Sequence, residues 1–287
     1  MSETPTSGTP TSGTPTSIAA GASPVELQAV TLGYGREPVS TYLDLAIPSG
    51  ELTMVIGPNG CGKSTALRAM ARLLPPRAGT VLLDGRDIKE LSTRQVARRL
   101  GLLPQQSIAP DGIRVAELVA RGRHPHQGPF RQWSETDETA VAEAMERTGV
   151  TPYSSLPVDQ LSGGQRQRVW IAMVLAQETP LLLLDEPTTF LDLTHQLEVL
   201  DLCQHLTHDG DRTIAAVMHD LDHACRYADH LIAMRNGTVI AAGPPAEIVT
   251  TELIRDVFDV EAMIIRDPVS ATPLVIPMIQ RWSYQRG

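Results

Sequence analysis

The chain has 287 residues, with 24 Lys and Arg against 33 Asp and Glu, so its formal net charge is −9. With 42% hydrophobic and 20% charged residues, its composition is that of a globular protein with a packed core. The acidic balance argues against broad contact with nucleic-acid backbones, so no nucleic acid is expected as a partner. Three cysteines without a CxxC pair favour a reducing compartment. The start, MSETPTSG, does not resemble a signal peptide, and no apolar run reaches the ~18 residues of a membrane-spanning helix.

The first half of the chain divides into a tail, a strand-rich part and a helical part. Residues 1–24 repeat TPTSG and contain Thr, Ser, Pro and Gly with few apolar residues, which predicts a disordered tail. Apolar patterns predict strands over 26–32, 51–57 and 80–85. Residues from about 88 to 160 have helical spacing and few strand signals, which predicts an inserted α-helical subdomain.

Strand patterns return in the second half. Residues 181–185 and 213–218 are continuous apolar runs, as expected for parallel strands buried on both faces. An Asn-Gly pair between two apolar runs predicts a hairpin over 231–243. Strands that alternate with helices predict one α/β domain over 25–250, followed by a small C-terminal extension, 251–287, with one helix.

A glycine-rich loop follows the strand predicted at 51–57 and opens a helix. Its sequence, GPNGCGKST, matches the pattern G-x-x-x-x-G-K-[ST]. Backbone N–H groups in such a loop can surround phosphate oxygens, and the helix N-terminus favours negative charge. Lys63 would reach the β- and γ-phosphates of a nucleotide, and Ser64 would offer its hydroxyl to Mg²⁺. The predicted nucleotide-binding loop comprises Gly57, Pro58, Asn59, Gly60, Cys61, Gly62, Lys63, Ser64 and Thr65.

Two carboxylates end the apolar run PLLLLDEP at 180–187. Asp185 would stand at the polar end of the strand, where it could hold the water shell of Mg²⁺. Glu186 points the other way and could orient or deprotonate an attacking water. A D-E pair after leucines is a common strand end, but its place after a nucleotide loop favours a functional role.

A second helix N-terminus suited to anions begins at LSGGQRQR, residues 161–168. Ser162 is the predicted N-cap, and the two glycines after it expose N–H groups. With LSGGQ between the nucleotide loop and LLLLDE, the sequence resembles the ATP-binding subunits of ABC transporters. In that family the LSGGQ signature contacts ATP held by a second copy. Its residues here are Leu161, Ser162, Gly163, Gly164 and Gln165.

The resemblance implies roles for four further residues. Gln105 in GLLPQQ matches the glutamine loop, which contacts Mg²⁺ and moves with the transmembrane partner, and Gln106 is the alternative. Asp192 in TTFLD matches the D-loop aspartate, and His219 matches the histidine that senses the γ-phosphate. Tyr34 in LGYG matches the aromatic residue that stacks on adenine. The implied catalytic residues are Glu186, His219 and Lys63, and the implied Mg²⁺ site comprises Ser64, Gln105 and Asp185.

Histidine spacing offers a competing interpretation. His219 and His223 are separated as in a helical two-histidine zinc site, with Asp220 where that motif has Glu. No third ligand is evident, and the strand before His219 fits the ATPase interpretation. His205 and His208 are interpreted as a solvated helix end rather than a metal site.

The resemblance also implies a fold and an assembly. The expected fold is α/β, a RecA-like P-loop ATPase core with an N-terminal antiparallel β piece and the inserted α-helical subdomain. Two copies would face each other head to tail, with ATP between the loop of one and the signature of the other. Transmembrane permease subunits, and indirectly a substrate-binding protein, are the other implied partners. The chain would then lie at the cytoplasmic face of the cell membrane, attached through the permease.

Three segments narrow the resemblance to the ATPases of iron–siderophore importers: 101–125, 191–202 and 257–277. This relation covers roughly residues 26–277. It implies that ATP binding and hydrolysis drive uptake of an iron(III)–siderophore complex. A haem or cobalamin importer ATPase, or an iron–sulfur cluster assembly ATPase, is the alternative.

Overall fold

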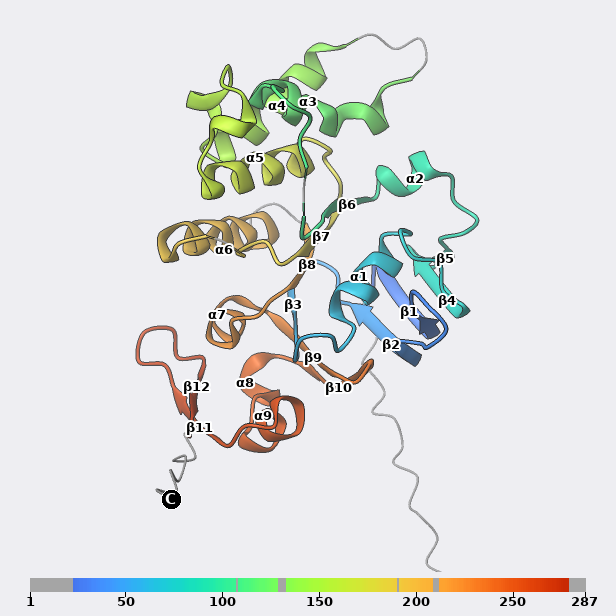
Figure 1. The fold of residues 1–287 in the computed structure, drawn as a ribbon, viewed down its shortest axis with the longest axis vertical. Helices are drawn as coiled ribbons and strands as arrows, with labels where there is room; N and C mark the ends of the chain where they lie inside the picture. The colour runs from blue at the N-terminus through green and yellow to red at the C-terminus, as the bar shows by residue number, and fades with distance from the viewer. Residues whose placement is uncertain (1–22, 107, 129–132, 190, 209–211, 279–287) are drawn as a thin grey trace, which may run out of the picture.

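The computed structural model describes residues 23–106, 108–128, 133–189, 191–208 and 212–278. Within these ranges a central sheet is flanked by a second sheet, with a group of helices at one end (Figure 1). Most of the predicted tail, up to residue 22, lies outside the described residues. The carbonyl of Pro24, a residue that the sequence assigned to the tail, accepts a hydrogen bond from the Asp84 N–H at 2.9 Å, so Pro24 contacts the folded domain.

The central sheet has six strands in the order β10-β9-β3-β8-β7-β6. Strands β9, β3, β8, β7 and β6 run parallel, and β10 pairs antiparallel with β9. Alternate residues face two different apolar clusters, since Met54 belongs to one and Val55 to the other. Burial on both faces explains the continuous apolar runs and confirms the predicted parallel strands and hairpin. The bounds are β3 Leu52–Ile56, β6 Leu100–Leu103, β7 Leu181–Asp185, β8 Thr213–Val217, β9 His230–Arg235 and β10 Thr238–Gly243.

The N-terminal sheet is antiparallel, in the order β2-β1-β4-β5. Helix α1, Lys63–Met70, contributes its apolar side to the same cluster as this sheet and one face of the central sheet. The antiparallel β piece is therefore confirmed, although the sequence interpretation missed β2, whose Leu43, Leu45 and Ile47 are buried. The strands are β1 Val25–Leu32, β2 Ser40–Ile47, β4 Ala78–Leu83 and β5 Arg86–Asp87.

The helical group differs in extent from the predicted insertion at 88–160. That interval includes β6, which belongs to the central sheet, and the helices α3 and α4 pack against α5, which begins after it. The sequence missed β6 because four residues, LGLL, are too short to carry a strand signal. The helices of this region are α2 Thr93–Ala97, α3 Val115–Ala120, α4 Glu135–Arg147 and α5 Gly163–Leu175, with 3-10 turns at Arg121–His126, Thr151–Tyr153 and Val158–Gln160.

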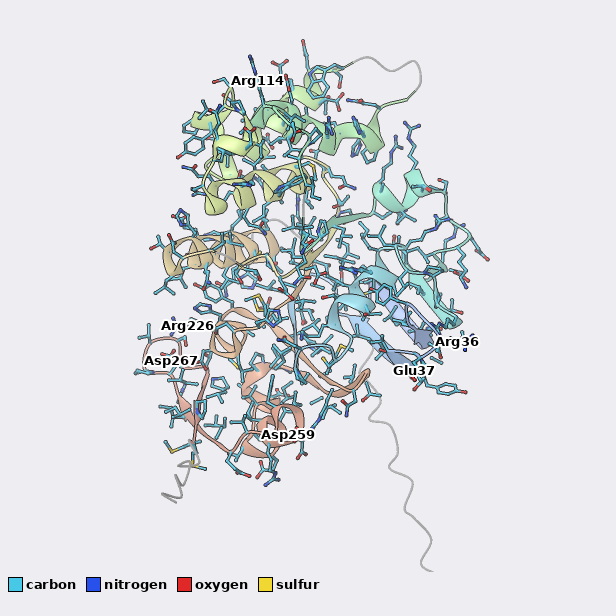
Figure 2. The ribbon with its side chains drawn as sticks, in the orientation of Figure 1. Arg36, Glu37, Arg114, Arg226, Asp259 and Asp267 are labelled. Atoms are coloured by element: carbon cyan, nitrogen blue, oxygen red, sulfur yellow. The ribbon has the colours of Figure 1, made fainter. Side chains whose placement is uncertain are left out.

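The C-terminal residues, 251–278, pack against the domain that precedes them. Val249, Leu253 and Val275 belong to the apolar cluster that covers one face of the central sheet, and Arg226 pairs with Asp267 at 2.5 Å (Figure 2). The division at residue 250 therefore stays a prediction. In the part of the chain that is described, no helix is long and apolar enough to cross a membrane. The remaining elements are α6 Leu193–His208, α7 Leu221–Tyr227, α8 Pro245–Ile248, α9 Thr251–Phe258, β11 Ala262–Arg266 and β12 Pro273–Pro277.

Candidate functional site

The functional motifs meet at the carboxyl ends of three neighbouring strands. Val217 at the end of β8 is in register with Val55 of β3 and with Asp185 of β7. The glycine-rich loop follows β3, Glu186 follows β7, and His219 comes two residues after β8. Ligands of open α/β sheets bind at this edge of the sheet, so strand order alone brings three distant sequence motifs to one place.

Lys63 is the first residue of α1 and is 5% exposed. Its ammonium donates to the carbonyl oxygens of Gly57 at 2.7 Å and Pro58 at 3.0 Å. The loop therefore encloses the lysine with its own backbone, and Gly62 reaches φ 105° to turn the chain into the helix. Both acceptors are neutral carbonyl oxygens. The anionic oxygens of a phosphate can replace them, because a hydrogen bond between two charged groups is stronger.

The β9–β10 hairpin contacts the glycine-rich loop at two points. The Gly237 N–H donates to the Cys61 carbonyl at 2.9 Å. At Gly57, a Cβ atom would lie 2.1 Å from the Met234 carbonyl oxygen, so only glycine allows this approach. The sequence predicted the hairpin but gave no signal that it contacts the loop.

Ser64 and Asp185 form the second part of the site. The Ser64 hydroxyl donates to Asp185 Oδ1 at 2.7 Å, joining the start of α1 to the end of β7. Burial raises the pKa of Asp185 above its ordinary value, while the hydrogen bond from Ser64 acts in the opposite direction. A carboxylate desolvated in this way gains from a cation placed beside it.

Glu186 is held by contacts on both carboxylate oxygens. His219 Nε2 lies 2.5 Å from Oε1, and the Thr189 hydroxyl donates to Oε2 at 3.1 Å. Burial raises the pKa of this carboxyl, but hydrogen bonding to His219 and Gln105 outweighs burial, and the net direction is downward. The backbone adopts φ 56°, a conformation rare for residues other than glycine and frequent at functional sites.

Lys63, Ser64 and Glu186 line one cavity of about 470 Å³, next to the glycine-rich loop. Asp185 is not part of the lining and contacts the cavity through Ser64. Gln105 is among the lining residues and Gln106 is not, which favours the predicted choice between the two glutamines. Val39 is a lining residue that sequence reasoning missed, because it lies in an irregular segment before β2. The full lining is Val39, Asn59, Gly60, Gly62, Lys63, Ser64, Thr65, Gln105, Glu186 and His219.

The remaining predicted residues do not line this cavity. Tyr34 is 60% exposed, and its hydroxyl accepts a hydrogen bond from Arg68 of α1 at 3.1 Å. Ser162 is the N-cap of α5, as predicted, and exchanges hydrogen bonds with Gln165 in a capping box. Asp192 uses Oδ1 to accept the His195 backbone N–H at 3.0 Å, so it caps α6.

The alternative zinc site lacks a ligand cluster. His219 contacts Glu186, whereas His223 lies 3.8 Å from Asp220 on its own helix. Within the described ranges there is no group of three or more His, Cys, Asp or Glu side chains able to hold a metal ion.

The site of a P-loop nucleotide-binding protein combines a β-strand, a glycine-rich loop with its lysine and a helix. Here β3, the loop and α1 supply these parts, and β7, which is separated from β3 by β8, adds the carboxylate. Residues 41–189 match the sequence profile of the ABC transporter family. The ferric enterobactin transport ATP-binding protein FepC of Escherichia coli (strain K12) is 55% identical over 251 residues, which span 88% of this chain and 93% of that protein.

Solved structures agree with this relation. One described as an inward-facing, metal-chelate type ABC transporter has a TM-score of 0.77 and 25% identity, covering 90% of this chain and 98% of that chain. The dimeric ATP-binding cassette MJ0796, bound to ADP and Pi, has a TM-score of 0.68 and 27% identity, covering 77% and 98%. The chain belongs to the ABC transporter family. It is an ATP-binding subunit, and its activity is ATP hydrolysis coupled to transport.

Proposed function

We propose that this chain powers an importer that carries an iron(III)–siderophore complex across the cytoplasmic membrane. The observation that carries the proposal is the single cavity that joins Lys63, Glu186 and His219, in a chain 55% identical to a ferric enterobactin transport ATPase. The chain would act at the cytoplasmic face of the membrane, bound to permease subunits. A substrate-binding protein would deliver the chelate from the other side.

The phosphates of ATP would occupy the cavity beside the glycine-rich loop. Lys63 would exchange its bonds to the Gly57 and Pro58 carbonyls for the β- and γ-phosphate oxygens. The loop N–H groups and the N-terminus of α1 would supply further positive potential. Tyr34 would stack on the adenine ring, at a position that its bond to Arg68 fixes relative to α1.

The side chains around Ser64 fit a magnesium ion. The Ser64 hydroxyl and the Asp185 carboxylate are in contact, and Gln105 lines the same cavity, so the donors are the oxygen atoms that Mg²⁺ prefers. When bound, Mg²⁺ neutralises charge on the β- and γ-phosphate oxygens. The desolvated Asp185 carboxylate would hold the ion's water shell.

Glu186 would orient the attacking water and accept its proton. Its carboxylate is ionised at neutral pH because its pKa lies below the ordinary value. In this structure His219 engages Oε1, and opening of that contact would free Oε1 to take the proton of the water. His219, released from Glu186, could then reach the γ-phosphate, which couples recognition of ATP to activation of the base.

Two copies would enclose ATP between the glycine-rich loop of one and the signature of the other. Ser162 is exposed at the N-terminus of α5, where its hydroxyl and the following N–H groups are open to a second molecule. The dimeric cassette MJ0796 is similar in fold and supports this arrangement. Hydrolysis would then open the dimer and reset the transporter.

The activity is tested with the purified chain and its Lys63→Ala variant. We expect ATP hydrolysis by the wild-type chain and none above background in the variant, because Lys63 is the cation nearest the phosphate site. Nucleotide binding, followed with a fluorescent ATP analogue, should weaken in parallel. Turnover at the wild-type rate in Lys63→Ala would refute the P-loop assignment.

The cargo is tested with the membrane complex that co-purifies with the tagged chain. In proteoliposomes, an iron(III)–siderophore with its binding protein should accelerate ATP hydrolysis, whereas haem and cobalamin should not. Acceleration of ATP hydrolysis by haem or cobalamin would show that this compound, and not an iron(III)–siderophore, is the cargo. Purification with a soluble scaffold and no integral membrane protein would favour an iron–sulfur cluster assembly ATPase.

A further inference from the structure

His195 lies in the first turn of α6 and contacts the D-loop aspartate twice. Its backbone N–H donates to Asp192 Oδ1 at 3.0 Å, and its ring Nδ1 lies 2.6 Å from the same oxygen. An ionised carboxylate has only acceptors, so Nδ1 is assigned the proton and donates. The backbone bond by itself completes the N-cap of α6. The side-chain bond is therefore an additional restraint on the Asp192 carboxylate.

The same ring lies against the signature motif. A Cβ atom placed on Gly164 would be 3.2 Å from His195 Cγ and 3.4 Å from Cδ2 and Nδ1. Three ring atoms at such similar distances put the ring directly beside the Gly164 backbone. A side chain at position 164 would push the imidazole away from its present place.

The ring thus joins two segments that are distant in sequence. Asp192 is exposed, with 67% of its side chain open to solvent, whereas the His195 side chain is 29% exposed. Helix α5 has a second link toward the same loop, where Gln167 Nε2 donates to the Pro187 carbonyl at 3.0 Å. His195 lies against both the D-loop carboxylate and the signature residue Gly164.

We propose that His195 is a positioning residue that holds the D-loop carboxylate and the signature glycine in one fixed arrangement, so that a subunit presents both together to the nucleotide of its partner. The inference rests on the proposed dimer with ATP between two copies. His195 itself would contact neither the nucleotide nor the attacking water. Its loss should weaken closure of the dimer and leave the subunit's own nucleotide loop unchanged.

The experiment uses the full-length chain in a Glu186→Gln background, where uncleaved ATP should accumulate the closed dimer. His195→Ala removes the ring and with it the contacts to Asp192 Oδ1 and to Gly164, while the backbone bond to Asp192 stays. His195→Asn keeps a side-chain donor near Asp192 without the ring. His195→Phe keeps a ring beside Gly164 without the donor. His205→Ala is the matched control, because His205 is on the same helix and its Nδ1 lies 2.7 Å from the Asp201 carbonyl oxygen, within α6 itself.

Three quantities are measured for each variant. They are the protein concentration at half-dimerisation with ATP and Mg²⁺, the affinity of the monomer for a fluorescent ATP analogue, and the melting temperature. For His195→Ala we expect half-dimerisation at about tenfold higher concentration, the effect of losing a hydrogen bond to a charged group. His195→Asn and His195→Phe should each lie between this variant and the parent. Monomer affinity, and all values for His205→Ala, should stay within about twofold of the parent.

Dimerisation of His195→Ala at the parental concentration would overturn the inference. So would an equal loss of monomer nucleotide affinity, because the effect would then lie in the fold as a whole. A Glu186→Gln parent that remains monomeric with ATP would instead refute the proposed dimer, and the inference would fall with it. The parent alone therefore distinguishes the two failures.

Discussion

Among the single residues of the site, Glu186 has the backbone conformation, the side-chain contact and the position expected of a group that takes part in the reaction. It has a left-handed backbone, a carboxylate in contact with His219, and a place in the cavity that also contains Lys63. A residue keeps a strained backbone conformation of this kind only where the surrounding structure holds it in place. The strand end at Asp185 and the contacts of Thr189 supply that support here.

Glu186→Gln preserves the size and hydrogen-bonding reach of the side chain but removes the basicity of the carboxylate. We expect ATP hydrolysis to fall about 10²-fold or more, the scale of losing a general base, while ATP still binds. Turnover and nucleotide affinity of the purified variant measure the two effects. Light scattering should detect an ATP-dependent dimer of this variant, and adding Ser162→Arg should abolish it. Normal hydrolysis by Glu186→Gln would remove Glu186 from the mechanism.

Tyr34 lies at the edge of the site and tests the adenine contact. Tyr34→Ala should cost roughly 1 kcal/mol of stacking, which corresponds to about a fivefold higher KM for ATP with little change in kcat. Tyr42→Ala is the matched control, because this tyrosine is 80% exposed on β2 and has no assigned role. An unchanged KM in Tyr34→Ala would leave Tyr34 with packing as its only role.

At the scale of elements, the β9–β10 turn and the glycine-rich loop behave as one unit. Gly237 has φ 77°, and a Cβ there would lie 2.1 Å from the Val39 carbonyl oxygen. Gly85 has a similar φ of 73° in another β turn, with nothing within 4 Å of its Cβ position. The two glycines therefore share a backbone requirement and differ in their surroundings.

Gly237→Ala should destabilise the fold and also raise the KM for ATP, because the displaced turn carries the N–H that binds the Cys61 carbonyl. Gly85→Ala should cost about 1 kcal/mol from backbone strain alone, with no change in KM. Melting temperature and steady-state kinetics separate the two effects. Equal KM values in both variants would show that the turn does not position the loop.

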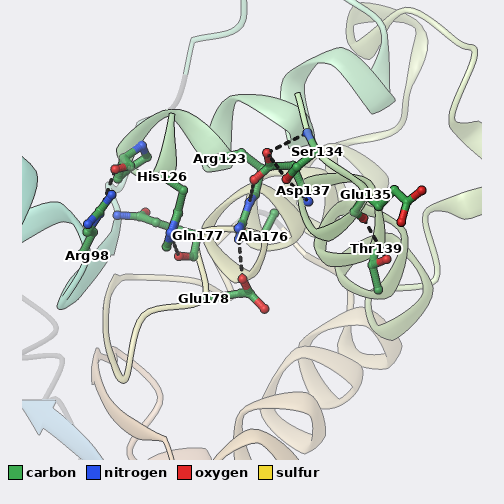
Figure 3. A network of polar contacts seen from close by, with 11 residues as sticks. Arg98, Arg123, His126, Ser134, Glu135, Asp137, Thr139, Ala176, Gln177 and Glu178 are labelled. Carbon is green, nitrogen blue, oxygen red and sulfur yellow. Dashed lines mark hydrogen bonds and ion pairs between the residues drawn. The ribbon is translucent and has the colours of Figure 1, made fainter. Parts of the chain in front are cut away.

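The helical group depends on a buried ion pair. Arg123 is 2% exposed and donates to Asp137 at 2.9 Å and to the Ala176 carbonyl at 2.8 Å, which joins α4 and α5 (Figure 3). Burial raises the pKa of Asp137, but hydrogen bonds from Ser134 and Arg123 outweigh burial and lower it. This stabilisation is present above the unfolded-state pKa of Asp137 and is lost as pH falls through the lower folded-state value.

Arg123→Met should destabilise the fold by about 3 kcal/mol or more, because it leaves the buried Asp137 carboxylate without its cation. Arg98→Ala is the control, since Arg98 is exposed and binds the Pro125 carbonyl at 3.0 Å at the surface. It should cost less than about 1 kcal/mol. Denaturant unfolding at neutral pH measures both. Similar losses in the two variants would argue against a special role for the buried pair.

At the scale of the whole molecule, residues 1–22 are expected to be dispensable. Their Thr, Ser, Pro and Gly composition offers little apolar surface to bury, so their removal should change neither the melting temperature nor ATP hydrolysis. A truncated chain that begins at residue 23 tests this, and it retains Pro24, whose carbonyl pairs with Asp84. A large fall in melting temperature would indicate that the tail packs on the domain.

Much of the fold could be predicted because its signals are local. The apolar runs of β7 and β8, the Asn-Gly turn and the capping residues each depend on a few consecutive residues. β6 was missed because a length of four residues leaves a pattern too weak to distinguish. β2 carries an alternation of Leu43, Leu45 and Ile47, a local signal that the sequence interpretation did not use. In sequence α5 has the pattern of a separate capped helix, and only packing joins it to α3 and α4.

The nucleotide loop, the strand-end carboxylates and the capped signature helix are each contiguous motifs, so their chemistry can be inferred from neighbouring residues in the chain. Which of these motifs meet depends on the folded chain. Strand order brings Gln105, Glu186 and His219 to the cavity beside Lys63, and side-chain packing sets His195 between Asp192 and Gly164. Such contacts join residues far apart in the chain, and their geometry depends on sheet register and helix packing, which no local pattern encodes.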